Sequence, residues 1–160
     1  MTLILTAGCS DFIVQVSDRR FCLAESTKHG VRLVDIKTDE GNKELVVVSY
    51  ATHFSVAFTG LAEVGGQSVG DWLAEVIVES KAAAQGISEC AQALRDAATR
   101  SFGAASSLGS TDFLEFVFSG YDARDKGPRV ILVSNFRTET HAIRPVPTRR
   151  FAILRPRNVE

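Results

Sequence analysis

Short runs of apolar residues, separated by turn-forming residues, predict two β-hairpins in the first third of the chain. Residues 2–7 and 12–17 would be the arms of the first hairpin. Residues 45–50 and 54–58 would be the arms of the second. Val, Leu and Phe dominate both arms of the second hairpin, which is the composition of buried strands. The pattern therefore predicts antiparallel strands at both places.

The stretch between these hairpins is polar and mixed. Residues 24–43 read AESTKHGVRLVDIKTDEGNK, and within them only residues 31–36 have the composition of a strand. We interpret most of this stretch as a long loop.

In the middle of the chain the apolar residues take the period of a helix. One set recurs at i, i+3, i+4, i+7 and i+8: Val69, Trp72, Leu73, Val76 and Ile77. Ser68 precedes this set as the expected N-cap, and Asp71 follows three residues later in the manner of a capping box. We expect Trp72 to lie in the core.

A second helical repeat follows Gly86. Its apolar positions are Ile87, Cys90, Ala91, Leu94, Ala97 and Ala98. Ser88 is the expected N-cap. The alanine-rich face of this helix predicts close packing against a neighbouring element.

Strands resume after a loop of small residues at 103–111. Apolar runs predict strands at 113–118, 129–134, 139–143 and 151–154. Strands and helices are segregated along the chain, which predicts an α+β fold with helices packed on a sheet. Residues 1–160 contain no repeat and no internal boundary, and we interpret them as a single domain.

Composition and charge argue against several classes of partner and cellular location. The net charge is −1, so there is no electrostatic reason to expect a nucleic acid or an anionic membrane as a partner. The first residues do not have the pattern of a signal peptide, and no apolar run is long enough to span a bilayer. We therefore expect a cytoplasmic protein. The three cysteines lack CxxC spacing, which favours reduced thiols, mostly in the core.

Thr2 is the first candidate for chemistry. Methionine aminopeptidase removes Met before a small residue, which would leave Thr2 with a free α-amine. Such an amine has a pKa of about 7.7–8.0 and is partly unprotonated at neutral pH. A threonine hydroxyl needs a base beside it to act as a nucleophile, and Thr2 would supply both groups. Asp18, at the end of the second strand, is the next candidate, although it could also be a solvated carboxylate paired with Arg19 or Arg20.

These features resemble the start of proteasome β subunits and of the bacterial peptidase of the same fold. Thr2, a hairpin and the segment SDRR, with its aspartate sixteen residues after the threonine, match that family without a gap. FTGLAE at 58–63 is similar to the A-G-x-A segment of the family, and the helix pair follows in the expected place. FVFSGYDARDKGPRVILV at 116–133 is similar to the strand, G-Y-D turn, G-P and strand of the family. The resemblance covers roughly residues 2–134.

The resemblance implies an N-terminal-nucleophile (Ntn) hydrolase, in which antiparallel sheets are sandwiched between helices in the order αββα. The family continues well beyond residue 160, and FAILRPRN at 151–158 stands where its glycine–serine segment should be. We therefore expect an incomplete second helical layer. An apolar sheet face left uncovered in this way would be a ready interface.

The resemblance also implies the roles of the site residues. Thr2 would be the nucleophile, Asp18 would orient Lys43, and the Lys43 ammonium would keep the Thr2 amine neutral. The backbone N–H of Gly60 would form the oxyanion hole. Three further positions match the family: Arg20 as a brace for Asp18, and Cys22 and Ala62, whose backbones would pair with an extended peptide.

Lys28 and Lys37 compete with Lys43 for the role of the catalytic lysine. The gap of 25 residues between Asp18 and Lys43 is longer than is usual in the family, because residues 24–42 look inserted. We prefer Lys43 because only this lysine directly precedes an apolar strand that leads into FTG. The alternative is that Lys43 is a surface lysine at a strand edge.

The expected function is that of a threonine-type hydrolase that cleaves peptide or other amide bonds without a metal or organic cofactor. The resemblance implies a homo-oligomer, and a partner subunit or ATPase is possible within that family. One alternative is a non-catalytic proteasome-like subunit or scaffold, and another is a small-molecule amidase of the same superfamily. If Met1 is retained, Thr2 has no free amine and catalysis would be blocked.

Overall fold

The computed structural model describes residues 3–9, 11–18, 21–27, 30–38, 42–50, 52–103, 113–122, 127–137 and 146–154. For residues 21–27, 30–38, 136–137 and 146–149 the description is of the backbone alone. Thr2, Arg20, most of the loop predicted at 103–111 and the strand predicted at 139–143 lie outside the described residues.

The described residues include most of the predicted strands and helices in the predicted order, together with elements that the apolar pattern did not predict. The strands are β1 (Ile4–Gly8), β2 (Ile13–Ser17), β3 (Phe21–Thr27), β4 (Gly30–Thr38), β5 (Glu44–Val48), β6 (Thr52–Gly60), β7 (Glu63–Val64), β8 (Gln67–Ser68), β9 (Leu114–Asp122), β10 (Pro128–Arg137) and β11 (Val146–Leu154). The helices are α1 (Val69–Ser80), the short 3₁₀ helix η1 (Ala82–Ala84) and α2 (Ile87–Gly103). The α+β fold class is confirmed.

A five-stranded antiparallel sheet is the centre of the molecule, with the strand order β11-β10-β9-β6-β5. Its middle strands pair in continuous register, from Thr52 opposite Asp122 to Gly60 opposite Leu114. Side chains alternate between the two faces of a sheet, so every second residue of β6 and β9 can face the same layer. The buried aromatic residues of these strands follow that alternation: Phe54, Phe58, Phe116 and Phe118.

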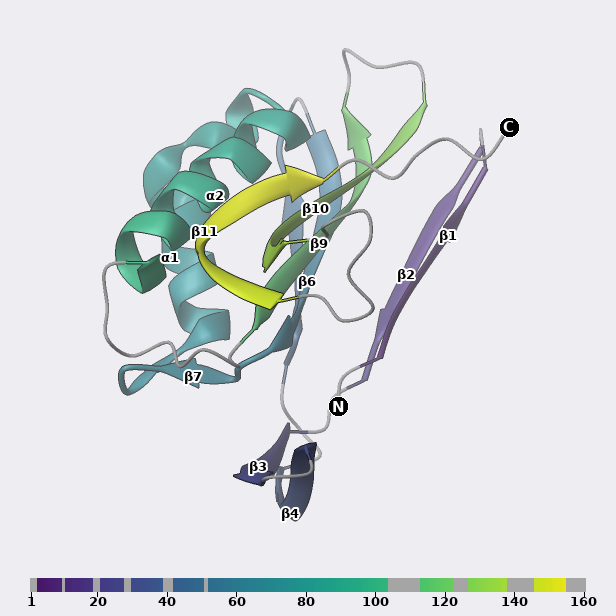
Figure 1. The fold of residues 1–160 in the computed structure, drawn as a ribbon. Helices are drawn as coiled ribbons and strands as arrows, with labels where there is room; N and C mark the ends of the chain where they lie inside the picture. The colour runs from purple at the N-terminus through teal and green to yellow at the C-terminus, as the bar shows by residue number, and fades with distance from the viewer. Residues whose placement is uncertain are drawn as a thin grey trace.

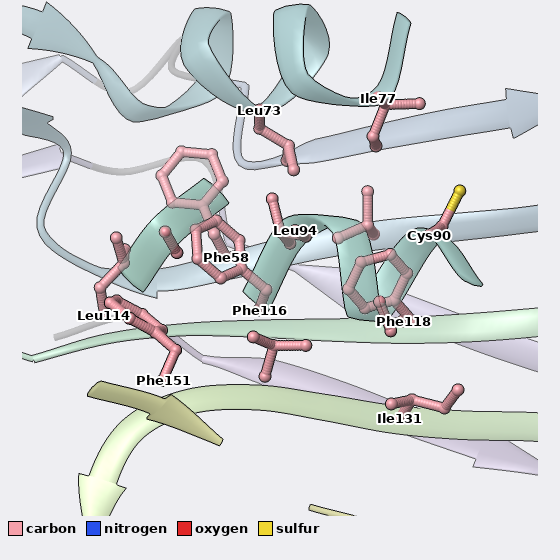
Figure 2. Close-up of a cluster of buried hydrophobic side chains, with 14 of the residues drawn as sticks. Phe58, Leu73, Ile77, Cys90, Leu94, Leu114, Phe116, Phe118, Ile131 and Phe151 are labelled. Atoms are coloured by element: carbon pink, nitrogen blue, oxygen red, sulfur yellow. The ribbon is translucent and has the colours of Figure 1, made fainter. Parts of the chain in front are cut away.

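Helices α1 and α2 cover one face of this sheet and enclose the core with it (Figures 1 and 2). The Trp72 ring lies 4.4 Å from the Phe102 ring and 5.9 Å from the Phe116 ring, measured between centroids. Ala91 and Ala98 of α2 are fully buried. The predicted core position of Trp72 and the close packing of the alanine-rich helix are confirmed.

The N-cap of α1 is confirmed and that of α2 is corrected. The Ser68 hydroxyl accepts a hydrogen bond of 3.4 Å from the Asp71 N–H. Helix α2 begins at Ile87, one residue before the predicted cap, and the Ile87 N–H donates to the Asp122 carboxylate at 3.3 Å. Ser88 lies inside the helix, where its hydroxyl accepts from the Arg129 guanidinium at 3.1 Å. A distant carboxylate thus satisfies one of the free N–H groups at the N-terminus of α2.

The β1–β2 hairpin lies over the other face of the five-stranded sheet (Figure 1). The Gln15 amide of β2 donates to the Val117 carbonyl at 3.1 Å and accepts from the Ser55 hydroxyl at 2.8 Å. It also donates to the Thr6 hydroxyl at 3.2 Å. The order of the layers is therefore helices, five-stranded sheet, hairpin.

The prediction of a long loop at 24–43 is wrong for most of that stretch. β3 and β4 pair as an antiparallel hairpin, from Phe21 opposite Thr38 to Thr27 opposite Gly30, with two shifts of register. Residues 31–36, which have the composition of a strand, lie within β4. A strand pair satisfies its backbone groups through the partner strand, so it can form from residues that lack a clear apolar alternation.

Within the described ranges, no helix is both long and apolar enough to cross a membrane.

Cys90 is buried in the core, and this burial raises the pKa of its thiol to about 12, whereas Cys9 is exposed. The expectation that the cysteines lie mostly in the core thus holds for Cys90 and not for Cys9.

Candidate functional site

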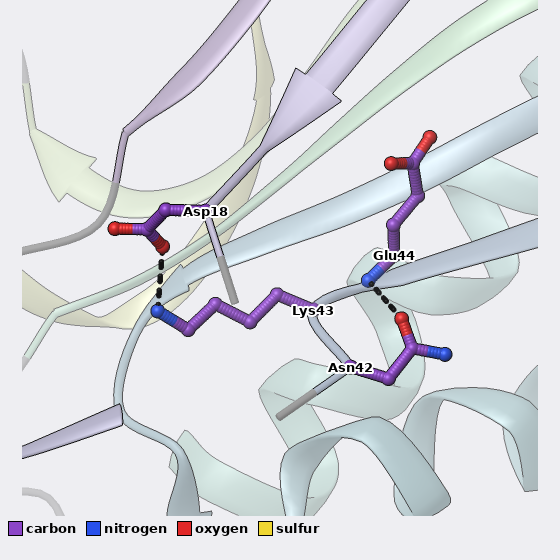
Figure 3. A network of polar contacts seen from close by, with 4 residues as sticks. All are labelled: Asp18, Asn42, Lys43 and Glu44. Atoms are coloured by element: carbon purple, nitrogen blue, oxygen red, sulfur yellow. Dashed lines mark hydrogen bonds and ion pairs between the residues drawn. The ribbon is translucent and has the colours of Figure 1, made fainter. Parts of the chain in front are cut away.

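A buried lysine and a carboxylate meet where the hairpin approaches the edge of the five-stranded sheet (Figure 3). The Lys43 Nζ lies 2.7 Å from Asp18 Oδ1, forming both a hydrogen bond and an ion pair. The Lys43 side chain is 2% exposed and that of Asp18 is 33% exposed. The structure therefore brings together two of the residues that the sequence pointed to. The side chains of Lys28 and Lys37 lie outside the described residues.

Local structure holds both ends of this pair. Asp18 directly follows β2, and its N–H donates to the Leu3 carbonyl at 3.0 Å, which extends the β1–β2 pairing by one step. Lys43 directly precedes β5, and its carbonyl accepts from the Phe58 N–H at 3.0 Å. The Asn42 side-chain oxygen accepts from the Glu44 N–H at 3.2 Å, which closes the turn before the strand (Figure 3).

Because Lys43 is buried, the Asp18 carboxylate stabilises the positive charge of its ammonium group. An ammonium removed from water loses its hydration, and a buried charge is tolerated only when it is paired and hydrogen-bonded. The Asp18 carboxylate, at 2.7 Å, is such a partner. An alternative interpretation, a surface lysine at a strand edge, does not fit a side chain that is 2% exposed.

Leu3 connects this pair to the start of the chain. Its carbonyl accepts from Asp18, so the residue that follows Thr2 in the sequence is bonded to the residue that carries the carboxylate. Thr2 itself lies outside the described residues. Its role stays a prediction.

Gly60 ends β6 in a conformation that only glycine adopts readily. Its φ is +104°, and a Cβ at this position would lie 2.0 Å from the Phe113 carbonyl oxygen. Successive N–H groups of a strand point to opposite sides. The Phe58 N–H points to Lys43, and the Leu61 N–H points the other way, to Phe113. The Gly60 N–H therefore points to the side of Lys43, about 7 Å further along the strand.

Glu115 is a titratable residue of this region that the sequence analysis missed. It lies opposite Thr59 on β6 and opposite Ser134 on β10. Its neighbours Leu114 and Phe116 face the helices, so Glu115 faces the layer of the hairpin. Burial raises the pKa of its carboxyl group, and a hydrogen bond from Ser134 partly opposes this. The available signal was a single charged residue within the apolar run FLEFVF.

The remaining candidates lie outside the five-stranded sheet. Cys22 lies on β3 with its backbone opposite Ile36 of β4. The Ala62 carbonyl accepts from the Val69 N–H at 2.9 Å at the start of α1. A peptide that paired with this carbonyl would have to use its second lone pair. Within the described part of the chain, no three His, Cys, Asp or Glu residues are grouped so that they could hold a metal ion.

The two partners of the ion pair are expected to differ in their effect on stability. Asp18→Asn would remove the negative charge that lies 2.7 Å from the buried Lys43 ammonium, and it should lower the free energy of unfolding by about 2 kcal/mol. Lys43→Met would leave a carboxylate that reaches water, so the loss should be below about 1 kcal/mol. Urea unfolding of both variants measures this difference. Equal losses would show that Lys43 does not depend on the carboxylate.

No family model matches the chain, and neither a curated protein nor a solved structure matches it.

Proposed function

We propose that this chain is an Ntn hydrolase of the proteasome β-subunit type, a threonine-type enzyme of the cytoplasm that cleaves peptide or other amide bonds. The single observation that carries the proposal is the buried Lys43 ammonium held at 2.7 Å by Asp18, which in turn is bonded to the residue after Thr2. The order of helices, sheet and hairpin fits three of the four layers of an αββα sandwich.

The proposed reaction starts from Thr2 after Met1 has been removed. The Thr2 Oγ attacks the carbonyl carbon of an amide while the α-amine takes the hydroxyl proton. Lys43 places a positive charge beside the amine and so favours its neutral form, in which it can act as a base. The tetrahedral intermediate then expels the amine of the substrate, which receives that proton, and leaves an ester on Thr2. Water, activated by the same α-amine, hydrolyses the ester and regenerates Thr2.

The backbone N–H of Gly60 also supports the proposal. It points to the side of Lys43, where an oxyanion formed by the attack of Thr2 could accept a hydrogen bond. A backbone N–H is a preorganised donor, and one such donor contributes about 3 kcal/mol to stabilisation of a tetrahedral intermediate. Arg20, Cys22 and Ala62 keep the supporting roles that the resemblance implies.

Covalent labelling tests this function. Intact-mass analysis first establishes whether Met1 is absent, and the Met-free protein is then incubated with a β-lactone probe. We expect one label per chain on Thr2, no label on Thr2→Ala, and labelling of Thr2→Ser, which keeps the hydroxyl. Lys43→Ala should slow labelling at least about 100-fold, which corresponds to about 2.7 kcal/mol of barrier. Lys37→Ala, the control lysine, should label at the rate of the unmodified chain.

The alternatives would give different results. A Met-free, folded protein that no probe labels would contradict catalysis and favour a non-catalytic subunit. Turnover of simple amides without turnover of peptides would favour a small-molecule amidase.

A further inference from the structure

The β1–β2 hairpin exposes its more apolar face. The outward side chains between residues 3 and 16 include Leu3, Leu5, Phe12, Val14 and Val16, which are between 50% and 58% exposed. The inward face, which meets the five-stranded sheet, has the polar residues Thr6, Gln15 and Ser17 among its half-buried positions. An amphipathic strand pair normally places its apolar face on the core. The opposite arrangement here indicates that a further layer covers the outer face.

The exposed apolar area is large enough for a contact between two copies of the chain. The five apolar side chains together expose on the order of 500 Å², which is close to the largest apolar patch of a typical monomer. Two such faces in contact would bury about 1,000 Å², which is the lower bound for a specific protein interface. Val46 and Val48 are also exposed. Val46 lies opposite Ser55, which bonds to Gln15, so these valines extend the apolar surface on the hairpin side of the sheet.

The charge of the face limits the kind of partner. The exposed outward positions of β1 and its flanks are Leu3, Leu5, Ala7 and Cys9, and those facing them are Phe12, Val14 and Val16. The centre of the face therefore has no charged side chain. Such a face can meet a copy of itself around a two-fold axis without placing like charges opposite each other. Among the described residues, its centre therefore offers no charge to a strongly acidic or basic partner.

We propose that the outer face of the β1–β2 hairpin is the interface of a homodimer, in which the hairpins of two copies pack face to face. Stacked sheets pack about 10 Å apart with interdigitating side chains, and an aligned crossing would bring Leu5 and Val14 of each copy to the centre. A two-stranded hairpin has marginal stability by itself. The dimer would therefore also stabilise β2, the strand that directly precedes Asp18. This proposal goes beyond the proposed function, and labelling of Thr2 does not decide it.

The experiment measures the dimer and places a charge at its centre. Sedimentation equilibrium of the full chain should give a dimer at a protein concentration on the order of 100 µM. Leu5→Lys and Val14→Lys each place two like charges close together across the axis, and each should raise the dissociation constant at least about 10-fold. Both side chains already reach water, so the fold should persist, which far-UV circular dichroism checks. The matched control is Val78→Lys, at an exposed valine of α1, which should leave the dissociation constant unchanged.

Other results would overturn the proposal. A monomeric wild-type chain at this concentration would mean that no second copy covers the hairpin. A dimer that both hairpin variants leave intact would place the interface elsewhere. Hydrogen exchange of residues 3–16 provides an independent readout, because their protection should rise with protein concentration. Protection that is independent of concentration would instead indicate that another segment of the same chain covers this face.

Discussion

Replacing Gly60 with alanine is expected to lower the free energy of unfolding by about 4 kcal/mol or more. The added Cβ would lie 2.0 Å from the Phe113 carbonyl oxygen and 2.9 Å from the Phe113 carbonyl carbon. These are backbone atoms of the neighbouring chain segment, so no side-chain rotation can relieve the overlap. The φ of +104° adds strain for any residue with a side chain. Relief would require β6 and β9 to separate at the end where Lys43 and Gly60 lie.

Chemical denaturation of Gly60→Ala measures the effect, with Gly65→Ala as the matched control. Gly65 also has a positive φ, of +60°, but no atom lies within 4 Å of its virtual Cβ. The control should therefore lose only about 1 kcal/mol, the cost of a left-handed conformation alone. A similar loss in the two variants would contradict the close approach at Phe113. Because the proposed oxyanion donor is Gly60, a Gly60→Ala chain that folded should also label more slowly.

Phe116→Ala is expected to lower the free energy of unfolding by about 4 kcal/mol. Phe116 is fully buried at the centre of the sheet, where it contacts helices and strands at once (Figure 2). Its ring centroid lies 5.9 Å from that of Trp72, 6.5 Å from that of Phe58 and 6.4 Å from that of Phe151. Removing the ring leaves a cavity among rigid aromatic neighbours, which cannot collapse to fill it.

Thermal and urea unfolding of Phe116→Ala test this value. Tyr50→Ala is the control, because Tyr50 is an aromatic residue that is fully exposed. Its loss should remain within about 0.5 kcal/mol. If Phe116→Ala were as mild as the control, the ring could not be a central contact between the helices and the sheet.

Neighbouring residues in the sequence predicted the N-terminal cap of helix α1 but not that of α2. The Ser68 hydroxyl caps α1 by accepting from the N–H of Asp71, three residues later, and this spacing is visible in the sequence. The N-terminus of α2 is capped by Asp122, 35 residues further along the chain. That carboxylate reaches Ile87 only because β9 ends beside the start of the helix. Ser88 was therefore a reasonable but wrong prediction.

The candidate site was likewise only partly predictable from local sequence. Asp18 and Lys43 could each be singled out from the sequence, since both flank apolar strands, but two other lysines competed for the same role. Their contact depends on the stacking of a hairpin on a sheet, which no local pattern contains. Glu115 was missed because its apolar neighbours concealed the single position that faces the other layer.

By itself, the sequence determined the types of most elements and their order, because strand and helix periodicities are properties of neighbouring residues. It also determined that Asp18 and Lys43 lie next to the ends of strands. Only the tertiary structure decided which face of the β1–β2 hairpin is exposed and which distant groups meet, such as Asp122 with Ile87. The physical reason is that an alternating strand can bury either face, and the choice depends on which layer packs against it.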